Sequence, residues 1–146
     1  NRLLLSDRLD HLIERAQRIK EQMVALEATL QSQIVERDVD FDQDVVYFGP
    51  DGARQTLVAT IRRGALLEVG LYPLDASMDH VQACRDFLQA RYARSGPEEV
   101  LCNAPEEAIA AFTVQRGERL LRIPTTGIER ELLELCRLNY DYQVRK

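Results

Sequence analysis

Residues 5–30 decide the architecture of this chain, and they read LSDRLDHLIERAQRIKEQMVALEATL. Apolar residues recur here in alternating steps of four and three, the spacing that keeps one narrow stripe of a helix in register. The pattern predicts a coiled-coil seam that forms an interface with another helix. The members of this stripe are Leu5, Leu9, Leu12, Ala16, Ile19, Met23, Leu26 and Leu30.

The predicted helix, from about Leu4 to Val35, is longer than the rest of the chain can cover. At 1.5 Å per residue it runs roughly 47 Å, whereas a compact body of ~100 residues has a diameter of roughly 35 Å. Part of the stripe must therefore meet another helix, because soluble proteins avoid large exposed apolar surfaces. The alternative is a long amphipathic helix that lies across its own sheet, since heptads and core faces share much of their pattern.

The residues beside the stripe bear on the choice of partner. In a parallel homodimer they would pair Arg15 with Lys20, so the charges across the interface are not complementary. We expect the partner to be either a second copy of the chain or another coiled-coil protein. The relative orientation of the two helices stays open.

Aspartates stand at alternate positions directly after the helix. A calcium-binding loop that opens in this way needs Gly at its sixth position and Glu at its twelfth, and this sequence has neither. We therefore expect no metal here and predict an acidic connector that leads into an edge strand, where charge discourages unwanted sheet pairing. The aspartates are Asp38, Asp40, Asp42 and Asp44.

The remainder of the chain predicts a small sheet and two further helices. From Val45 the apolar residues alternate with period two, and the turns GPDG at 49–52 and RG at 63–64 separate three strands. A helix is predicted for residues 77–94, and a last helix opens at Thr126 with a capping box to Glu129. Between these helices we expect a short strand at 100–102, a helical turn at 105–111 and a hairpin formed by 112–115 and 119–123.

These elements predict an α+β fold. Its architecture is a long N-terminal amphipathic, coiled-coil helix followed by a small antiparallel sheet with helices packed on one face. Residues 1–36 are the predicted oligomerisation helix, and residues 37–146 are the predicted globular domain.

No pattern in the chain predicts a catalytic residue, a metal site or a cofactor. His80 and Cys84 lie one helical turn apart, but no further ligand has a matching spacing. The cysteines, three in number and widely spaced, cannot form a disulfide framework, which favours a reducing intracellular compartment, cytoplasmic or nuclear. No apolar run approaches the ~20 residues that a membrane span requires, so a soluble chain is expected.

Charge argues against nucleic acid as a partner. The chain has 19 basic and 24 acidic residues and a net charge of −5, whereas phosphate binding requires a basic surface. Arginines at the ends of the two predicted hairpins could nevertheless gather into an anion-binding edge, although surface turns collect charge in any case. These arginines are Arg62, Arg63, Arg116 and Arg119.

The sequence therefore predicts a non-enzymatic interaction, adaptor or scaffolding module that oligomerises through its N-terminal coiled coil. The element order is similar to that of the coil-and-head modules of eukaryotic kinetochore assembly. It is also similar to the acidic type III secretion chaperones, which implies a dimeric chaperone as the alternative. Binding of nucleic acid or another anion through the hairpin arginines is the second alternative.

Overall fold

The computed structural model describes residues 2–37, 40–110 and 120–144 of the chain. A single long helix leads into a sheet that carries two further long helices, and residues 106–110 add a short helix. No helix in these ranges is both long and apolar enough to cross a membrane. The elements are α1 (Arg2–Arg37), β1 (Gln43–Phe48), β2 (Gln55–Arg62), β3 (Ala65–Pro73), α2 (His80–Tyr92), β4 (Glu99–Cys102), β5 (Leu120–Arg122) and α4 (Gly127–Val144).

The sheet has five strands in the order β3-β2-β1-β4-β5. Strands β1, β2 and β3 form the predicted antiparallel meander, whereas β4 runs parallel to β1 and β5 runs parallel to β4. The α+β class is confirmed, but the sheet is mixed, because α2 carries the chain back across the sheet before β4 begins. The predicted edge strand after the acidic connector is also wrong, since β1 lies at the centre of the sheet.

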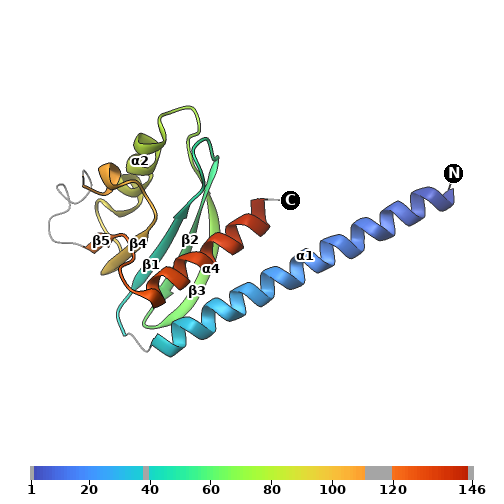
Figure 1. Ribbon diagram of the computed structural model, residues 1–146, viewed down its shortest axis with the longest axis horizontal. Helices are drawn as coiled ribbons and strands as arrows, with labels where there is room; N and C mark the ends of the chain where they lie inside the picture. Colours follow the sequence, from blue (N-terminus) through green and yellow to red (C-terminus); the bar gives the residue numbers. More distant parts are fainter. Residues whose placement is uncertain (1, 38–39, 111–119, 145–146) are drawn as a thin grey trace.

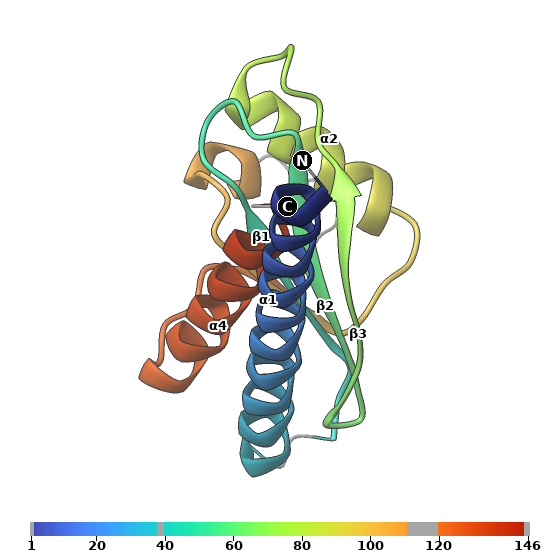
Figure 2. The same ribbon diagram turned by 90° about the vertical axis from the view of Figure 1, so that its right-hand side faces the viewer.

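Helices cover both faces of the sheet, although the sequence predicts them on one face. Figure 1 shows α1 and α4 on one side of the strands and α2 on the other, and Figure 2 shows α1 beside α4. The reason lies in β1, where consecutive residues Val45 and Val46 are both fully buried. Side chains of neighbouring strand residues point to opposite faces, so each of these valines belongs to a separate core.

Candidate functional site

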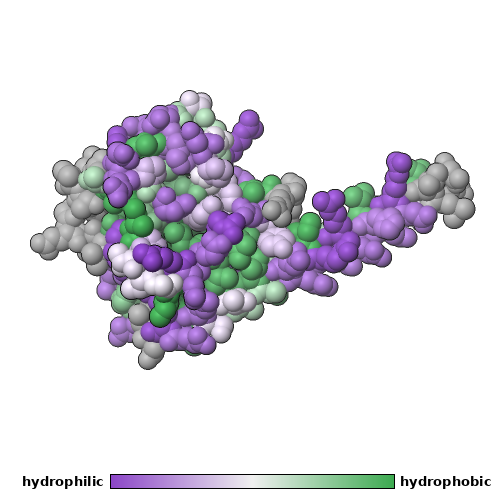
Figure 3. All heavy atoms as spheres, viewed as in Figure 1, coloured by the Kyte–Doolittle hydropathy of each residue, from purple (hydrophilic) through white to green (hydrophobic). Residues whose placement is uncertain are grey.

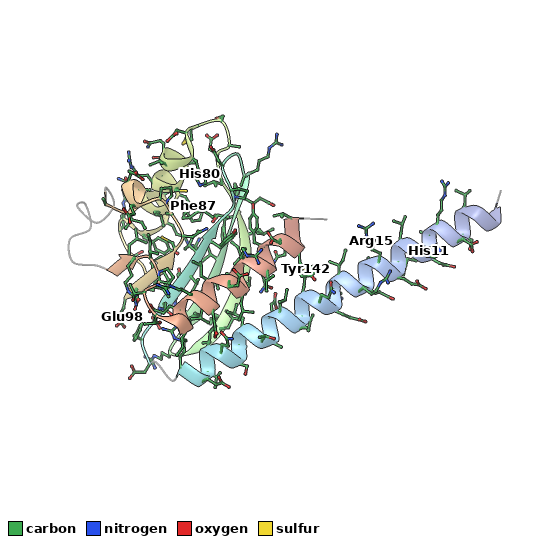
Figure 4. The ribbon with its side chains drawn as sticks, in the orientation of Figure 1. His11, Arg15, His80, Phe87, Glu98 and Tyr142 are labelled. Atoms are coloured by element: carbon green, nitrogen blue, oxygen red, sulfur yellow. The ribbon has the colours of Figure 1, made fainter. Side chains whose placement is uncertain are left out.

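The N-terminal half of α1 projects from the body of the molecule (Figure 1). Leu5, Leu9 and Leu12 are 66%, 58% and 63% exposed. Figure 3 shows apolar atoms interspersed among hydrophilic ones along this projection, and Figure 4 places His11 and Arg15 on it, away from the body. The predicted long helix is confirmed, and its interface role stays a prediction.

The C-terminal part of the same stripe is packed into the body. Leu30, the last residue of the stripe, and Ile34, one turn beyond it, are fully buried in the core where α1 packs against α4 and β3. Gln31 adds a polar anchor, because its Oε1 accepts a hydrogen bond of 2.8 Å from the main-chain N–H of Leu66 on β3. One continuous helix is therefore fixed at one end and exposed at the other.

A hollow of about 810 Å³ runs along the middle of α1. Its floor consists of stripe residues that are exposed or half-buried, and charged side chains stand at its rim. Such a shape suits a ligand with an apolar ridge, such as the side chains of a second helix. The lining residues are Leu12, Arg15, Ala16, Ile19, Lys20, Met23, Val24 and Glu27.

The predicted anion-binding edge is only partly described. Arg62 is directed to Asp44, with 2.8 Å between Nη1 and Oδ1, and Asp44 also accepts a hydrogen bond of 2.7 Å from Tyr92 Oη. Arg63 is exposed, and its main-chain N–H donates to Asp42 Oδ1 at 3.1 Å. The charge of Arg62 is therefore already balanced. Arg116 and Arg119 lie outside the described residues, so the anion-binding edge stays a prediction.

A buried ionic cluster joins β4, β5 and α4, and no pattern in the sequence predicts it. Arg122 contacts the carboxylates of Glu99 and Glu129, which are only 6% and 5% exposed. The hydrogen bond from Arg122 is the main cause that lowers the pKa of Glu129 to about 2, and main-chain donors at Thr125 and Thr126 contribute to the same shift. The predicted capping box is confirmed, since Glu129 N–H donates to Thr126 Oγ1 at 3.2 Å and Thr126 N–H donates to Glu129 Oε1 at 3.3 Å.

Cys84 belongs to the core, and His80 lies half-buried beside it. Cys84 Sγ lies 3.7 Å from His80 Nε2, and burial raises the pKa of the Cys84 thiol to about 12. The thiol is therefore protonated at neutral pH and is a poor nucleophile. Within the described ranges, no group of three or more His, Cys, Asp or Glu side chains could hold a metal ion.

Side chains of the chain itself lie at the place where open sheets usually bind ligands. This place lies at the carboxyl ends of β1 and β4, where the strand order reverses. Asn103 occupies it, accepting from Phe48 N–H at 2.7 Å and donating to Phe48 O at 2.9 Å. On the other side, the ring of Tyr140 lies directly against Gly49. The projecting half of α1, with its exposed leucines and its hollow, is the candidate functional surface.

The close approach of Tyr140 makes Gly49 necessary. A Cβ at this position would lie 2.7 Å from Ala53 Cβ and closer still to the Tyr140 hydroxyl. We expect Gly49→Ala to cost about 1–3 kcal/mol of the free energy of unfolding, because overpacking forces side chains out of place. Urea unfolding followed by circular dichroism measures this loss.

Gly127→Ala is the matched control for this substitution, because a Cβ at Gly127 meets nothing within 4 Å. It should leave the stability unchanged or raise it slightly, since alanine favours the helix. The cost of Gly49→Ala should also shrink in a Tyr140→Ala background. Equal losses for the two glycine substitutions would contradict the packing argument.

Comparison with known proteins gives three similar sequences, all named UvrABC system protein C. The protein of Syntrophotalea carbinolica is 30% identical over 141 residues, which cover 91% of this chain and 23% of that protein. The protein of Desulforudis audaxviator is 32% identical over 139 residues, which cover 86% of this chain and 22% of that protein. The protein of Desulforapulum autotrophicum is 28% identical over 147 residues, which cover 94% of this chain and 24% of that protein.

The chain thus spans about a quarter of the length of the curated relatives that it matches. The similarity extends over both α1 and the body, because 86% or more of the chain is aligned in each case. No family model and no solved structure matches the chain.

These relatives correct four predictions. The prediction of a non-enzymatic scaffold or adaptor, with a secretion-type chaperone as its alternative, is wrong, because all three relatives are components of the UvrABC system. The predictions that the protein is not an enzyme and that nucleic acid is not its partner are wrong for the same reason. The physical cause is that the chain spans only about a quarter of the length of these relatives, so its composition and motifs describe only that part of them.

Proposed function

We propose that this chain is a segment of a protein that works as UvrABC system protein C does, within a nuclease that repairs DNA. The observation that carries the proposal is the alignment of 86–94% of the chain with three such proteins at 28–32% identity. An enzyme of this kind acts where DNA is, inside the cell. The reducing compartment predicted from the cysteines agrees with that location.

Within such an enzyme, the body holds α1 in a fixed direction. The buried Leu30 and Ile34 and the Gln31 hydrogen bond supply the anchor, and the exposed leucines supply the contact surface. The segment contacts another component of the same system through the stripe from Leu5 to Met23. This contact would bury leucines that are now more than half exposed, which is the main favourable term in protein association.

An exchange of segments tests the proposal. The aligned segment of the Syntrophotalea carbinolica protein is replaced by this chain, and incision of damaged duplex DNA is measured with the other components of that system. We expect the chimera to keep its incision rate within about tenfold of the parent rate, a loss of no more than ~1.4 kcal/mol in the activation barrier. Deletion of the segment should abolish incision.

A folded chimera that shows no incision would refute the proposed function. Circular dichroism and a cooperative unfolding transition establish that the chimera is folded. A second chimera carries Gly127→Ala, a substitution whose added Cβ meets no atom within 4 Å. It should incise DNA at the same rate as the first chimera.

A further inference from the structure

A second, smaller hollow lies beside α2, which covers the face of the sheet opposite to α1 and α4 (Figure 1). Its volume is about 240 Å³, less than the roughly 300–1,000 Å³ of a site that encloses a whole small molecule. This size suits a single side chain of a larger partner. The lining of this α2 hollow includes Leu74, Asp75, Met78, Asp86 and Phe87.

The floor of the α2 hollow is apolar and partly aromatic. Leu74 is buried there, and Met78 and Phe87 are half-buried. Figure 4 places Phe87 on α2. Its ring makes two edge-to-face contacts, with ring centroids 5.6 Å from Phe48 and 6.5 Å from Tyr72. A methylene stem can pack on such a floor, and a cation over the face of the ring is attracted to it.

Two carboxylates stand at the rim, and no cation of the described ranges lines the α2 hollow. Asp75 Oδ1 accepts hydrogen bonds from the main chain and the hydroxyl of Ser77, and Asp86 Oδ1 accepts one of 2.6 Å from Gln82 Nε2. The Oδ2 atoms of both carboxylates have no hydrogen bond or ion pair to a residue that the structure describes. The hydrogen bonds from Ser77 lower the pKa of Asp75, so this group is ionised at neutral pH.

We propose that the α2 hollow binds a lysine or arginine side chain presented by a partner protein. The inference goes beyond the proposed function, because α2 and α1 cover opposite faces of the sheet. Lysine and arginine combine an apolar stem with a charged end group. The stem covers Met78 and Phe87, and the end group meets the free oxygens of Asp75 and Asp86. The charges on the two sides of this contact are complementary.

Other occupants match the α2 hollow less well. Asp75 and Asp86 would repel the phosphate backbone of a nucleic acid. A free divalent cation such as Ca²⁺ takes at least about six oxygen ligands, whereas most of the lining here is apolar. An apolar side chain would cover the floor but would leave both carboxylates without a counterion.

Three capped synthetic peptides test the proposal on the full chain. They share flanks of glycine and serine and differ only at the central residue, which is arginine, norleucine or glutamate. Norleucine supplies an apolar stem without a charge. Binding is measured by NMR titration of the backbone amide signals.

We expect the arginine peptide to bind about fivefold more tightly than the norleucine peptide, the usual effect of two exposed ion pairs. It should shift the signals of residues 74–78 and 83–90, which border the α2 hollow. The glutamate peptide should not bind. The preference for arginine should shrink at high salt, because exposed charges are screened.

Neutral variants of the same shape identify the rim. The double variant Asp75→Asn with Asp86→Asn keeps both Oδ1 acceptors, and it should bind the arginine and norleucine peptides equally. The double variant Asp10→Asn with Asp51→Asn is the matched control, because it removes the same net charge at exposed positions outside the α2 hollow. This control should keep the preference for arginine. Circular dichroism confirms that each variant is folded.

Equal affinities of the unmodified chain for the arginine and norleucine peptides would overturn the inference, as would shifts confined to signals from outside the α2 hollow. A preference for arginine that survives in the double variant of Asp75 and Asp86 would overturn it as well. Spermidine that binds the α2 hollow as tightly as the arginine peptide would identify the occupant as a free polyamine. Self-association that the same double variant abolishes would identify it as a second copy of the chain.

Discussion

Arg122→Met will lower the free energy of unfolding by about 3–5 kcal/mol, the usual cost of leaving buried charges without their partner. Arg122 joins the carboxylates of Glu99 and Glu129, both of which are buried. Its removal leaves two like charges close together without a counterion. Since a domain of this size is stable by roughly 5–15 kcal/mol, urea unfolding should show a large shift of the midpoint.

Arg137→Met is the control for this prediction. Arg137 also pairs with two carboxylates, those of Glu134 and Asp141, but this triad lies on the exposed side of α4. Exposed ion pairs contribute about 0–1 kcal/mol, so the control should lose little stability. Similar losses for the two variants would show that burial of the carboxylates is not the decisive factor.

The pH dependence of stability should change in the same variant. In the native protein the pKa of Glu129 is about 2, below its ordinary value of 4.5. A lowered carboxyl pKa contributes stability that is fully present above pH 4.5 and is lost as the pH falls toward 2. Arg122→Met removes the main cause of this shift, so the variant should lose much less stability across that range.

The same substitution at two positions of the α1 stripe should have very different effects. Leu30 is fully buried, whereas Leu9 is 58% exposed. Leu30→Ala should cost about 2–5 kcal/mol, because it removes buried methyl groups and leaves a cavity. Leu9→Ala should change the stability of the isolated chain by no more than about 0.5 kcal/mol.

Thermal and urea unfolding of the two variants, followed by far-ultraviolet circular dichroism, measures this difference in stability. Helix propensity is the same in both cases, since each variant exchanges one leucine for alanine in the interior of α1. A loss at Leu9 as large as that at Leu30 would mean that the projecting half is covered in the isolated chain.

Much of the fold could be predicted because its signals are local. The heptad steps from Leu5 to Leu30 determined α1, the Gly52 and Gly64 turns, both with positive φ, separated the first strands, and the capping box at Thr126 marked the start of α4. Each of these signals depends on residues a few positions apart, where backbone geometry and spacing decide the outcome.

Long-range features could not be predicted in the same way. The bulge between Thr60 and Ile61 pairs Ile61 with Leu66, which leaves Leu67 exposed at 64%, although strict alternation would place it on the core face. The Arg122 cluster unites residues from β4, β5 and α4. Nothing near any one of its members in the sequence indicates the others.

The function escaped prediction for a different reason. The net charge of −5 belongs to a chain about a quarter as long as its relatives, so it says little about the charge of a whole protein of that kind. The net charge also conceals an uneven arrangement on α1, where Arg8, Arg15 and Lys20 lie beside the stripe and acids on the opposite side of the helix cancel their charge. The positions of individual charges on the helix are therefore more informative than the net charge of the chain.

The unbroken course of α1 has a mechanical consequence. From the buried Ile34 to the tip at Leu5 the helix acts as a lever of roughly 44 Å, so a tilt of about 5° at its base moves the tip by about 4 Å. Displacements too small to disturb the core could thus carry a bound partner across the width of a side chain. Packing around the fulcrum, where Gln31 meets β3, would set both the resting direction of the lever and its stiffness.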